Sequence, residues 1–297
     1  MKRVIAIVGP TASGKTALSV QLAQAFNTEI ISADSRQFYK EMSIGTAVPS
    51  AEELASAPHH FIQHKSIFKP YNVGDFERDF LSLSTELFKK HDTIILVGGS
   101  GLYIDAACKG LHKLPERNDA IRATLQQELQ QNGIESLQKQ LAKLDSEYYQ
   151  KADIQNPHRL IRALEILQQS KSKKMAELYS QSTPERAFEC IYIGLNTDRK
   201  VLYKRIAQRV DQMIAAGLLN EAKALYPHQE LNALNTVGYK ELFQYFDGNW
   251  NLDFAISEIK KNTRRFAKRQ LTWFRKNKKI HWFDINYDLT EVTKHLF

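Results

Sequence analysis

Eight residues near the N-terminus constrain the fold of this chain more than any other feature. The phosphate-binding pattern G-x-x-x-x-G-K-[ST] is matched in full by Gly9, Pro10, Thr11, Ala12, Ser13, Gly14, Lys15 and Thr16. A buried-strand pattern, Arg3–Val8, precedes this P-loop, and a helical pattern, Lys15–Phe26, follows it. In such a loop the backbone N–H groups and the helix N-terminus bind phosphate oxygens. We therefore expect Lys15 to contact the terminal phosphate and the Thr16 hydroxyl to bind Mg²⁺.

Short apolar runs alternate with helical patterns over the first third of the chain. Strands are expected at Arg3–Val8, Glu29–Ser32, Thr93–Val97, Cys190–Leu195 and Ile280–Phe283. The helical pattern Gly74–Lys90 lies between the second and third of these runs. This alternation predicts parallel strands joined by crossover helices. The expected fold class is α/β, with a P-loop NTPase-like parallel sheet and flanking helices.

A long polar stretch interrupts this alternation. Residues 115–184 are almost wholly helical in pattern and rich in Gln, Lys and Glu, so we expect a largely helical inserted domain there. The P-loop core domain then comprises residues 1–114 and 185–297 and ends in basic helices. No apolar run approaches the roughly 18 residues of a membrane helix. The two cysteines, Cys108 and Cys190, are typical of buried thiols in a reducing compartment, so we expect a cytoplasmic protein.

One segment carries the whole basic excess of the chain. The formal net charge is +8, and ten Lys or Arg residues without an acid lie between Lys260 and Lys279. A helix is expected over Ala255–Lys276, with a buried stripe formed by Ile256, Ile259, Phe266 and Trp273. The outward cations, which include Lys261, Arg265 and Arg269, would suit the phosphate backbone of a nucleic acid. An ordinary solvated helix face is the alternative, although such faces usually mix both signs of charge.

Two strand ends carry further candidate residues. The strand Glu29–Ser32 leads to Asp34, and the carboxyl ends of parallel strands meet at one crevice, so Asp34 should face the P-loop. A carboxylate there can accept a proton from a nucleophile, or it can bind Mg²⁺ or cap a helix. The strand Thr93–Val97 ends in Gly98-Gly99-Ser100-Gly101, without the acid expected of an ATP-hydrolysing motor. These glycines permit either the close approach of a ligand or a tight turn.

Two arginines lie one helical turn apart in the second half of the chain. Arg205 and Arg209 could neutralise a diphosphate leaving group, which would give Arg205 a catalytic role and Arg209 a binding role. They could equally pair with acids such as Asp211 or Glu221.

Seven motifs in order together resemble one family, the tRNA dimethylallyltransferases. They are the P-loop and the segments Ile31–Ser35, Ile44–Ala47, Gly98–Tyr103, Asn156–Glu165, Val237–Lys240 and Lys268–Arg275. The matches extend from the first strand to about residue 284, and their ordered combination is highly specific. No zinc-finger pattern follows them, so the chain resembles the shorter, bacterial type. Two positions depart from the family pattern: Val48 replaces a usual Lys, and Ser100 replaces a usual Thr.

The resemblance implies a reaction and its partners. A dimethylallyl group would pass from dimethylallyl diphosphate to N6 of the adenosine 3′ of the anticodon in a tRNA, with release of diphosphate. Asp34 would be the general base, the P-loop would hold the diphosphate, and Mg²⁺ would be the cofactor. The tRNA anticodon stem-loop would be contacted by Asp34, Ser35, Arg36, Gln37, Ser100, Arg122, His158, Arg159, Leu160, Ile161, Arg162, Asn235, Thr236, Val237, Gly238, Tyr239 and Lys240. We expect a monomer without membrane attachment.

Two other functions agree with part of these patterns. A P-loop small-molecule kinase would turn over ATP and would have no use for the basic helix. A non-catalytic RNA-binding protein that uses nucleotide as a switch would not need Asp34.

Overall fold

The computed structural model describes residues 1–170, 174–180 and 183–296. The chain forms two compact units: Met1–Cys108 with Arg186–Phe297, and Lys109–Glu185. The second unit begins six residues before Pro115, where the helical composition begins. The residues between 110 and 118 form neither helix nor strand, yet Leu114 packs on the helical core and the Pro115 carbonyl accepts a hydrogen bond from Arg162.

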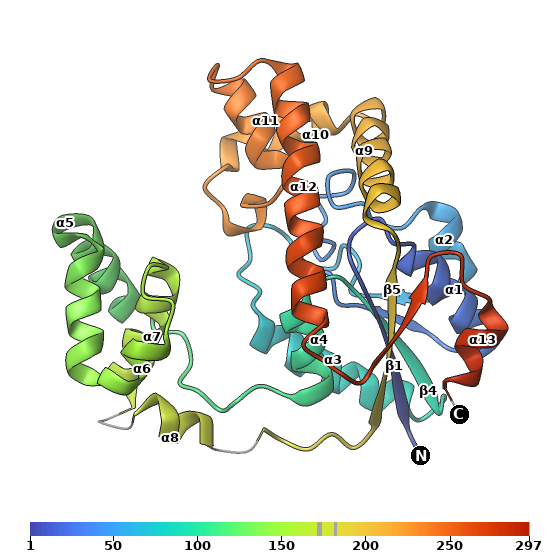
Figure 1. Ribbon diagram of the computed structural model, residues 1–297, viewed down its shortest axis with the longest axis horizontal. Coiled ribbons are helices and arrows are strands. Elements are labelled where there is room, and N and C mark those ends of the chain that lie inside the picture. The colour runs from blue at the N-terminus through green and yellow to red at the C-terminus, as the bar shows by residue number, and fades with distance from the viewer. Residues whose placement is uncertain (171–173, 181–182, 297) are drawn as a thin grey trace. The chain divides into compact units, whose positions relative to one another are not determined.

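A six-stranded, fully parallel sheet forms the centre of the first unit (Figure 1). Its strands are β1 (Arg3–Val8), β2 (Ile30–Ser32), β3 (His59–His60), β4 (Thr93–Val97), β5 (Glu189–Asn196) and β6 (Ile280–Asp284). Their spatial order is β3-β2-β4-β1-β5-β6. All five predicted strands are confirmed. The run at 190–195 is β5 and completes the sheet as expected, and the run at 280–283 is β6 and pairs with β5 at the edge of the same sheet. The short strand β3 was not predicted, because two histidines show no periodicity.

Helices cover both faces of this sheet and extend beyond its carboxyl end. They are α1 (Lys15–Ala25), α2 (Ala51–Ser56), α3 (Val73–Leu87), α4 (Gly101–Lys109), α9 (Arg199–Ala215), α10 (Leu218–Leu225), α11 (Tyr239–Phe246), α12 (Leu252–Phe274) and α13 (Leu289–Lys294), with short 3-10 turns at Tyr226–His228 and Asn232–Leu234. No helix in the described parts of the chain is long and apolar enough to cross a membrane.

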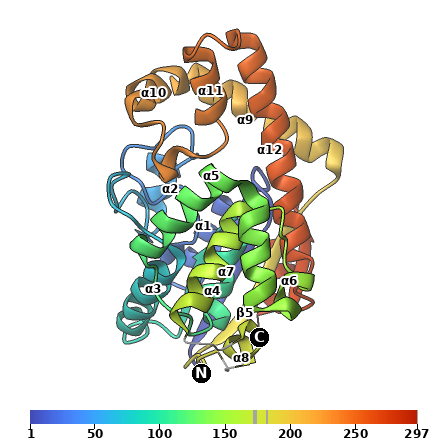
Figure 2. The ribbon, with the colours of Figure 1, turned by 90° about the vertical axis from the view of Figure 1, so that its left-hand side faces the viewer.

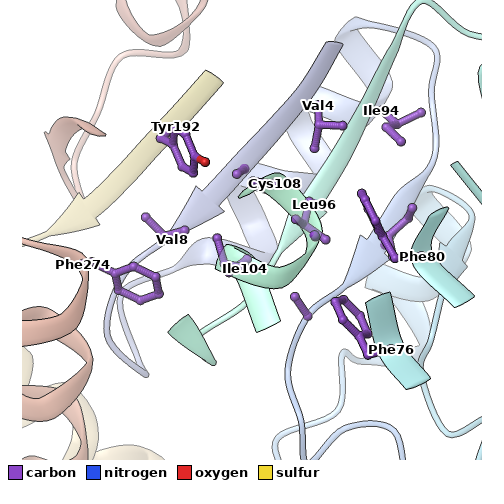
Figure 3. Packing of buried hydrophobic residues seen from close by; sticks show 14 of the residues in the cluster. Val4, Val8, Phe76, Phe80, Ile94, Leu96, Ile104, Cys108, Tyr192 and Phe274 are labelled. Atoms are coloured by element: carbon purple, nitrogen blue, oxygen red, sulfur yellow. The ribbon is translucent and has the colours of Figure 1, made fainter. Parts of the chain in front are cut away.

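The central strands β1 and β4 and most of β5 are apolar on both faces, which allows helices to pack against each face. On one side, Phe76 and Phe80 of α3 and Ile104 of α4 pack against side chains that include Leu96 of β4 (Figure 3). On the other side, Leu18 and Leu22 of α1 pack in one core with residues of β1, β4, β5 and α13. Burial of each such large apolar side chain contributes about 1.5 to 3 kcal/mol. The two layers hold the carboxyl ends of the strands in fixed positions.

A second core lies among helices α9 to α12. Its buried residues include Val210, Leu218, Tyr239, Leu242 and Ile259. Helix α12 packs against both α9 and α11, and Figure 1 shows α12 alongside α9. This core holds the basic helix in place beside the P-loop.

The second unit is helical, as its polar composition predicted. It contains α5 (Asp119–Leu144), α6 (Ser146–Lys151), α7 (Pro157–Gln169) and α8 (Met175–Ser180), and Figure 2 shows α5 beside α7. The side chains of Asn118 and Asn156 cap α5 and α7, because each accepts hydrogen bonds from backbone N–H groups of the first turn. Leu137, Leu141, Leu160 and Leu164 form part of its buried core.

The expected buried stripe of α12 is largely wrong. Ile259 is buried, but Ile256 is only half-buried, and Phe266 and Trp273 are 38% and 40% exposed. The buried line of the helix is instead formed by Ala255, Ile259, Ala267, Gln270 and Phe274. Small side chains and an amide occupy this line where α12 lies against the P-loop and the glycines after β4, which leave little space. Phe266 and Trp273 are displaced to the edge of the helix, where they line a cleft.

Candidate active site

The P-loop connects β1 to α1 and has the backbone conformation of an anion-binding loop. Ala12 and Gly14 have left-handed conformations, with φ of 64° and 88°, which turn successive N–H groups toward one side. A Cβ atom at Gly9 would lie 2.4 Å from the Leu195 carbonyl oxygen of β5, so only glycine fits there. The Ser13 hydroxyl donates to the Pro10 carbonyl at 2.8 Å and closes the loop. The left-handed residues, the glycine at position 9 and this internal hydrogen bond together shape the loop.

Three cations surround this loop. The Lys15 ammonium donates to the Pro10 carbonyl at 2.7 Å, and Arg205 donates from Nε to the Ala12 carbonyl at 2.9 Å. Arg209 donates from Nη1 to the Thr11 hydroxyl at 3.2 Å. Three positive charges placed around a ring of N–H groups favour a ligand with several negative charges, such as a diphosphate.

Burial and mutual repulsion lower the pKa values of two of these groups, Lys15 and Arg209. Burial, with the charge of Arg209, lowers the pKa of Lys15 to about 8, although Asp34 opposes this change. Burial and the charge of Arg205 likewise lower the pKa of Arg209. An anion in the loop would reverse both effects, because it favours the charged forms.

The alternative partners proposed for these arginines are engaged elsewhere. Asp211 pairs with Lys260 at 2.6 Å. Both oxygens of Glu221 accept hydrogen bonds, from the backbone N–H groups of residues 43–45 and from the Tyr239 hydroxyl. Neither acid therefore pairs with Arg205 or Arg209, and the binding of a diphosphate by these two arginines stays a prediction.

Asp34 follows β2 directly and lines the same cleft as the P-loop. Its Oδ1 accepts a hydrogen bond from the Arg36 N–H at 3.0 Å, which orients a half-buried carboxylate. The next residue, Ser35, donates its N–H to the Ser100 hydroxyl at 3.1 Å, so the loops after β2 and β4 are joined. The cleft has a volume of about 940 Å³ and is lined by residues from the carboxyl ends of β2 and β4, from the P-loop, and from α9 and α12.

The glycines after β4 make room for protein groups. A Cβ atom at Gly99 would lie 2.2 Å from the Gln270 side chain, and one at Gly101 would lie 2.2 Å from the Trp273 ring. At Gly98 the obstacle is the Ala33 carbonyl, at 2.5 Å. These glycines therefore accommodate α12 and the segment after β2, and the close approach of a ligand to them stays a prediction.

The segment Asn235–Lys240 forms another wall of the cleft, with Asn235, Thr236, Val237, Gly238 and Lys240 at its surface. The Arg36 guanidinium donates to the carbonyls of Asn232 and Ala233 at 3.0 Å and so attaches this wall to the Asp34 loop. The Tyr239 side chain is fully buried. Tyr239 therefore supports this wall from behind and does not itself line the cleft.

Gln37 also lines the cleft, and its amide is already engaged. Its Nε2 donates to the Ala47 carbonyl at 2.8 Å and holds the segment that contains Val48. Val48 lines the cleft as an apolar residue, where the resemblance leads to an expectation of a cation.

The cations of α12 differ in which side chains contact them. Lys261 pairs with Glu258 at 2.8 Å, so part of its charge is neutralised. Arg265 is exposed and donates to the Asn262 side chain, and Arg269 is exposed, lies over the Phe266 ring and lines the cleft. The partner of Lys261, Glu258, lies two residues before the acid-free segment 260–279. A count of charges within that segment therefore did not reveal the pair.

The helical unit contains the remaining expected tRNA contacts. Arg122 and Arg162 both donate to the fully buried Glu165 carboxylate, at 3.0 and 2.8 Å. His158 and Arg159 are exposed in the first turn of α7. The side chains at 160 and 161, a Leu and an Ile, are buried in the core of this unit, so any contact from these two positions would come from the backbone.

Thr16 lines the cleft beside Lys15 and is the residue expected to bind a metal ion. Among the described residues, no three His, Cys, Asp or Glu side chains cluster in a way that would hold a metal. The Thr16 hydroxyl fits Mg²⁺ that takes its other ligands from a bound diphosphate, since Mg²⁺ is usually held by few protein groups and by substrate phosphates.

Sequence reasoning gave Gln270 and Trp273 no role in the site. Gln270 is buried between the P-loop and the loop after β4, and the Trp273 Nε1–H donates to Asp105 at 2.8 Å. A glutamine on the apolar side of a helix is the signal that could have identified the first of them, since a buried amide requires partners.

Comparisons with known proteins agree with this geometry. A family model described as IPP transferase matches residues 37–277. The tRNA dimethylallyltransferase of Christiangramia forsetii is 58% identical over 99% of this chain and 96% of that protein. The enzyme of the same name from Flavobacterium johnsoniae is 54% identical over 100% of this chain and 97% of that protein.

Two solved structures are also similar. A full-length tRNA isopentenylpyrophosphate transferase from Bacillus halodurans has a TM-score of 0.74 and 38% identity, covering 100% of this chain and 96% of that chain. A eukaryotic dimethylallyltransferase acting on tRNA has a TM-score of 0.81 and 26% identity, covering 99% of this chain and 76% of that chain.

Proposed function

The chain belongs to the IPP transferase family, and on that premise we propose that its cleft transfers a dimethylallyl group from dimethylallyl diphosphate to N6 of the adenosine 3′ of the anticodon in a tRNA. Diphosphate is the second product. The observation that carries this proposal is the arrangement of Lys15, Arg205 and Arg209 around an anion-binding loop, with the Asp34 carboxylate in the same cleft.

The P-loop side of the cleft serves the leaving group. As the bond between C1 of the dimethylallyl group and the diphosphate oxygen breaks, negative charge increases on the diphosphate. The loop N–H groups, Lys15, Arg205 and Arg209 surround this position, so they would stabilise the developing charge electrostatically. Mg²⁺, when bound, adds positive charge to the diphosphate oxygens, and the Thr16 hydroxyl is the residue that would hold it.

The Asp34 side of the cleft serves the nucleophile. An adenine N6 is a poor nucleophile because its lone pair is delocalised into the ring. As the C–N bond forms, N6 becomes positive, and Asp34 accepts its proton. The Arg36 N–H holds the carboxylate in one orientation through Oδ1, which leaves the second oxygen for the proton.

The remaining cleft walls and the basic helix serve the tRNA. The target base must leave its stack to reach the cleft, and the single-stranded anticodon loop allows this at low energetic cost. Arg265 and Arg269 would contact the phosphate backbone, which orients the RNA without reading its sequence. On the helical unit, Arg122, His158, Arg159 and Arg162 would contribute further contacts.

A donor comparison tests this function against a kinase. We expect dimethylallyl diphosphate to release diphosphate only when tRNA is present. ATP should compete with the donor for the P-loop and should not be hydrolysed, since β4 ends without an acid to hold a catalytic metal. ATP hydrolysis that is required for product formation would contradict the proposal. We further propose that the enzyme works in the cytoplasm and that it is a monomer. Gel filtration at micromolar concentration would check the monomeric state.

A further inference from the structure

Helix α12 carries a buried amide that joins two loops of the active site. The Gln270 side chain is 6% exposed. Its Oε1 accepts a hydrogen bond from the Thr11 N–H at 2.9 Å, and its Nε2 donates to the Gly99 carbonyl at 3.0 Å. One amide therefore connects the P-loop after β1 to the loop after β4. Because both halves of the amide are paired, its orientation is fixed.

The lack of a side chain at Gly99 leaves the space that the Gln270 amide occupies. A Cβ atom at Gly99 would lie 2.2 Å from Gln270 Nε2, whereas the nearest atom outside that side chain, the Gly9 carbonyl oxygen, would be 3.8 Å away. The backbone of Gly99 does not have a positive φ, so conformation alone does not require glycine there. Among the described residues, the Gln270 side chain is therefore the obstacle to an alanine at position 99.

Thr11 is held on its other side by a cation of the donor site. Its hydroxyl accepts from Arg209 Nη1, while its N–H is taken by Gln270. These two bonds fix the orientation of the peptide that enters the left-handed turn at Ala12. A change at Gln270 would therefore be transmitted to the N–H groups that face the donor.

We propose that Gln270 is a positioning residue for the donor: it holds the P-loop in its anion-binding conformation from the helix that faces the tRNA. This inference rests on the proposed function, in which the P-loop binds the diphosphate of the donor. Gln270 itself does not touch the reacting atoms. Its effect reaches them through Thr11 and Arg209.

The first experiment replaces the amide by an apolar side chain of similar length. Gln270→Met should raise KM for dimethylallyl diphosphate about tenfold, because the buried hydrogen bonds of the amide to the Thr11 N–H and to the Gly99 carbonyl are both lost. KM for tRNA should stay within about twofold. Binding of inorganic diphosphate, measured by calorimetry without tRNA, should weaken by the same factor, which a change in packing alone would not cause.

A matched control is available in the helical unit. Gln138 donates from its side-chain amide to the Ile154 carbonyl at 3.0 Å, far along the chain from the P-loop. Gln138→Met should leave diphosphate binding unchanged. Equal diphosphate affinity in Gln270→Met and wild type would overturn the inference.

A second experiment uses the steric fit between Gly99 and the Gln270 side chain. Gly99→Ala alone should displace the amide and weaken diphosphate binding about as much as Gln270→Ala does. In the Gln270→Ala background, Gly99→Ala should have no further effect, because the colliding group is absent. Additive losses in the double variant would contradict a role through this contact. This cycle also remains informative if Gln270→Met does not fold.

The outcomes separate this inference from the proposed function. If wild-type enzyme does not transfer the dimethylallyl group, the proposed function fails. If wild type is active and diphosphate binding does not depend on Gln270, only the positioning role fails.

Discussion

The Lys15 ammonium donates a hydrogen bond to the carbonyl oxygen of Pro10, 2.7 Å away, so the P-loop lysine is folded against its own loop. Burial and the nearby Arg209 lower the pKa of Lys15 to about 8. In the free enzyme Lys15 therefore loses its charge as pH rises through that value, whereas a bound diphosphate restores the charge. We predict that KM for dimethylallyl diphosphate rises above pH 8, by up to about tenfold per pH unit.

Lys15→Met provides the control for this pH dependence. The variant keeps the length of the side chain and removes the titrating group, so its KM for the donor should be high at every pH and should lose the rise above pH 8. Affinity for tRNA should change little. A variant that retained the wild-type pH profile would show that another group titrates.

The second prediction concerns Asp34. Asp34→Asn keeps an oxygen that can accept the Arg36 N–H bond, so the loop after β2 should retain its conformation. The amide cannot take up the N6 proton, and loss of a general base typically lowers the rate about 10²- to 10⁴-fold. We expect single-turnover transfer to fall in that range while tRNA binding persists. A rate within about threefold of wild type would remove Asp34 from the mechanism.

The third prediction concerns the exposed cations of α12. Replacing Arg265 and Arg269 together by Gln should lower the slope of log K for tRNA against log salt by about 0.7 to 0.9 for each phosphate group that the variant no longer binds. Affinity should fall similarly for cognate and non-cognate tRNAs, because backbone contacts do not read sequence. Lys261→Gln is the matched control, since Glu258 already pairs with that lysine and its replacement should change the slope less. An unchanged slope in the double variant would identify this face as ordinary solvated surface.

The fourth prediction concerns the helical unit. Burial opposes ionisation of Glu165, but hydrogen bonds from Arg162 and from the Asn118 N–H outweigh it and hold its pKa below the usual range. A lowered carboxyl pKa contributes stability above the unfolded value of about 4.3, and this stability is lost as pH falls through the folded value. Glu165→Gln should destabilise the unit by about 1 to 2 kcal/mol at neutral pH, since both arginines remain partly exposed to solvent.

Hydrogen exchange of the α5 and α7 amides would measure this destabilisation. Glu147→Gln is the control in the same unit, because Glu147 forms an exposed pair with Lys151 whose loss should leave the protection of α5 and α7 nearly unchanged. Equal protection of α5 and α7 in Glu165→Gln and wild type would contradict a stabilising role for the buried carboxylate.

The strands and the P-loop could be predicted because their signals are local. β1, β4 and β5 are apolar on both faces, and the loop pattern depends on eight adjacent residues. The place of Asp34 beside the P-loop followed from the rule that parallel strands end at one crevice. Those parts of the site needed no knowledge of which helix packs where.

The orientation of α12 could not be predicted in this way. Periodicity favoured Phe266 and Trp273 as buried residues, yet the helix buries Ala267 and Gln270 instead. The reason lies in two distant segments, since the P-loop and Gly99 leave space only for small side chains or a hydrogen-bonded amide. Which residues a helix buries depends on the segments that pack against it, and hydrophobic periodicity carries no information about those segments.

Mass analysis of nucleosides from enzyme-treated tRNA tests whether the cleft transfers a dimethylallyl group to adenosine. Purified enzyme is incubated with unmodified tRNA and dimethylallyl diphosphate, and the tRNA is digested to nucleosides for mass analysis, with Asp34→Asn as the paired sample. We predict a single new nucleoside, an adenosine that has gained one dimethylallyl group in place of an N6 hydrogen, and that is nearly absent with Asp34→Asn. Unmodified adenosine alone in the wild-type reaction, or a product formed from ATP in place of the prenyl donor, would contradict the account.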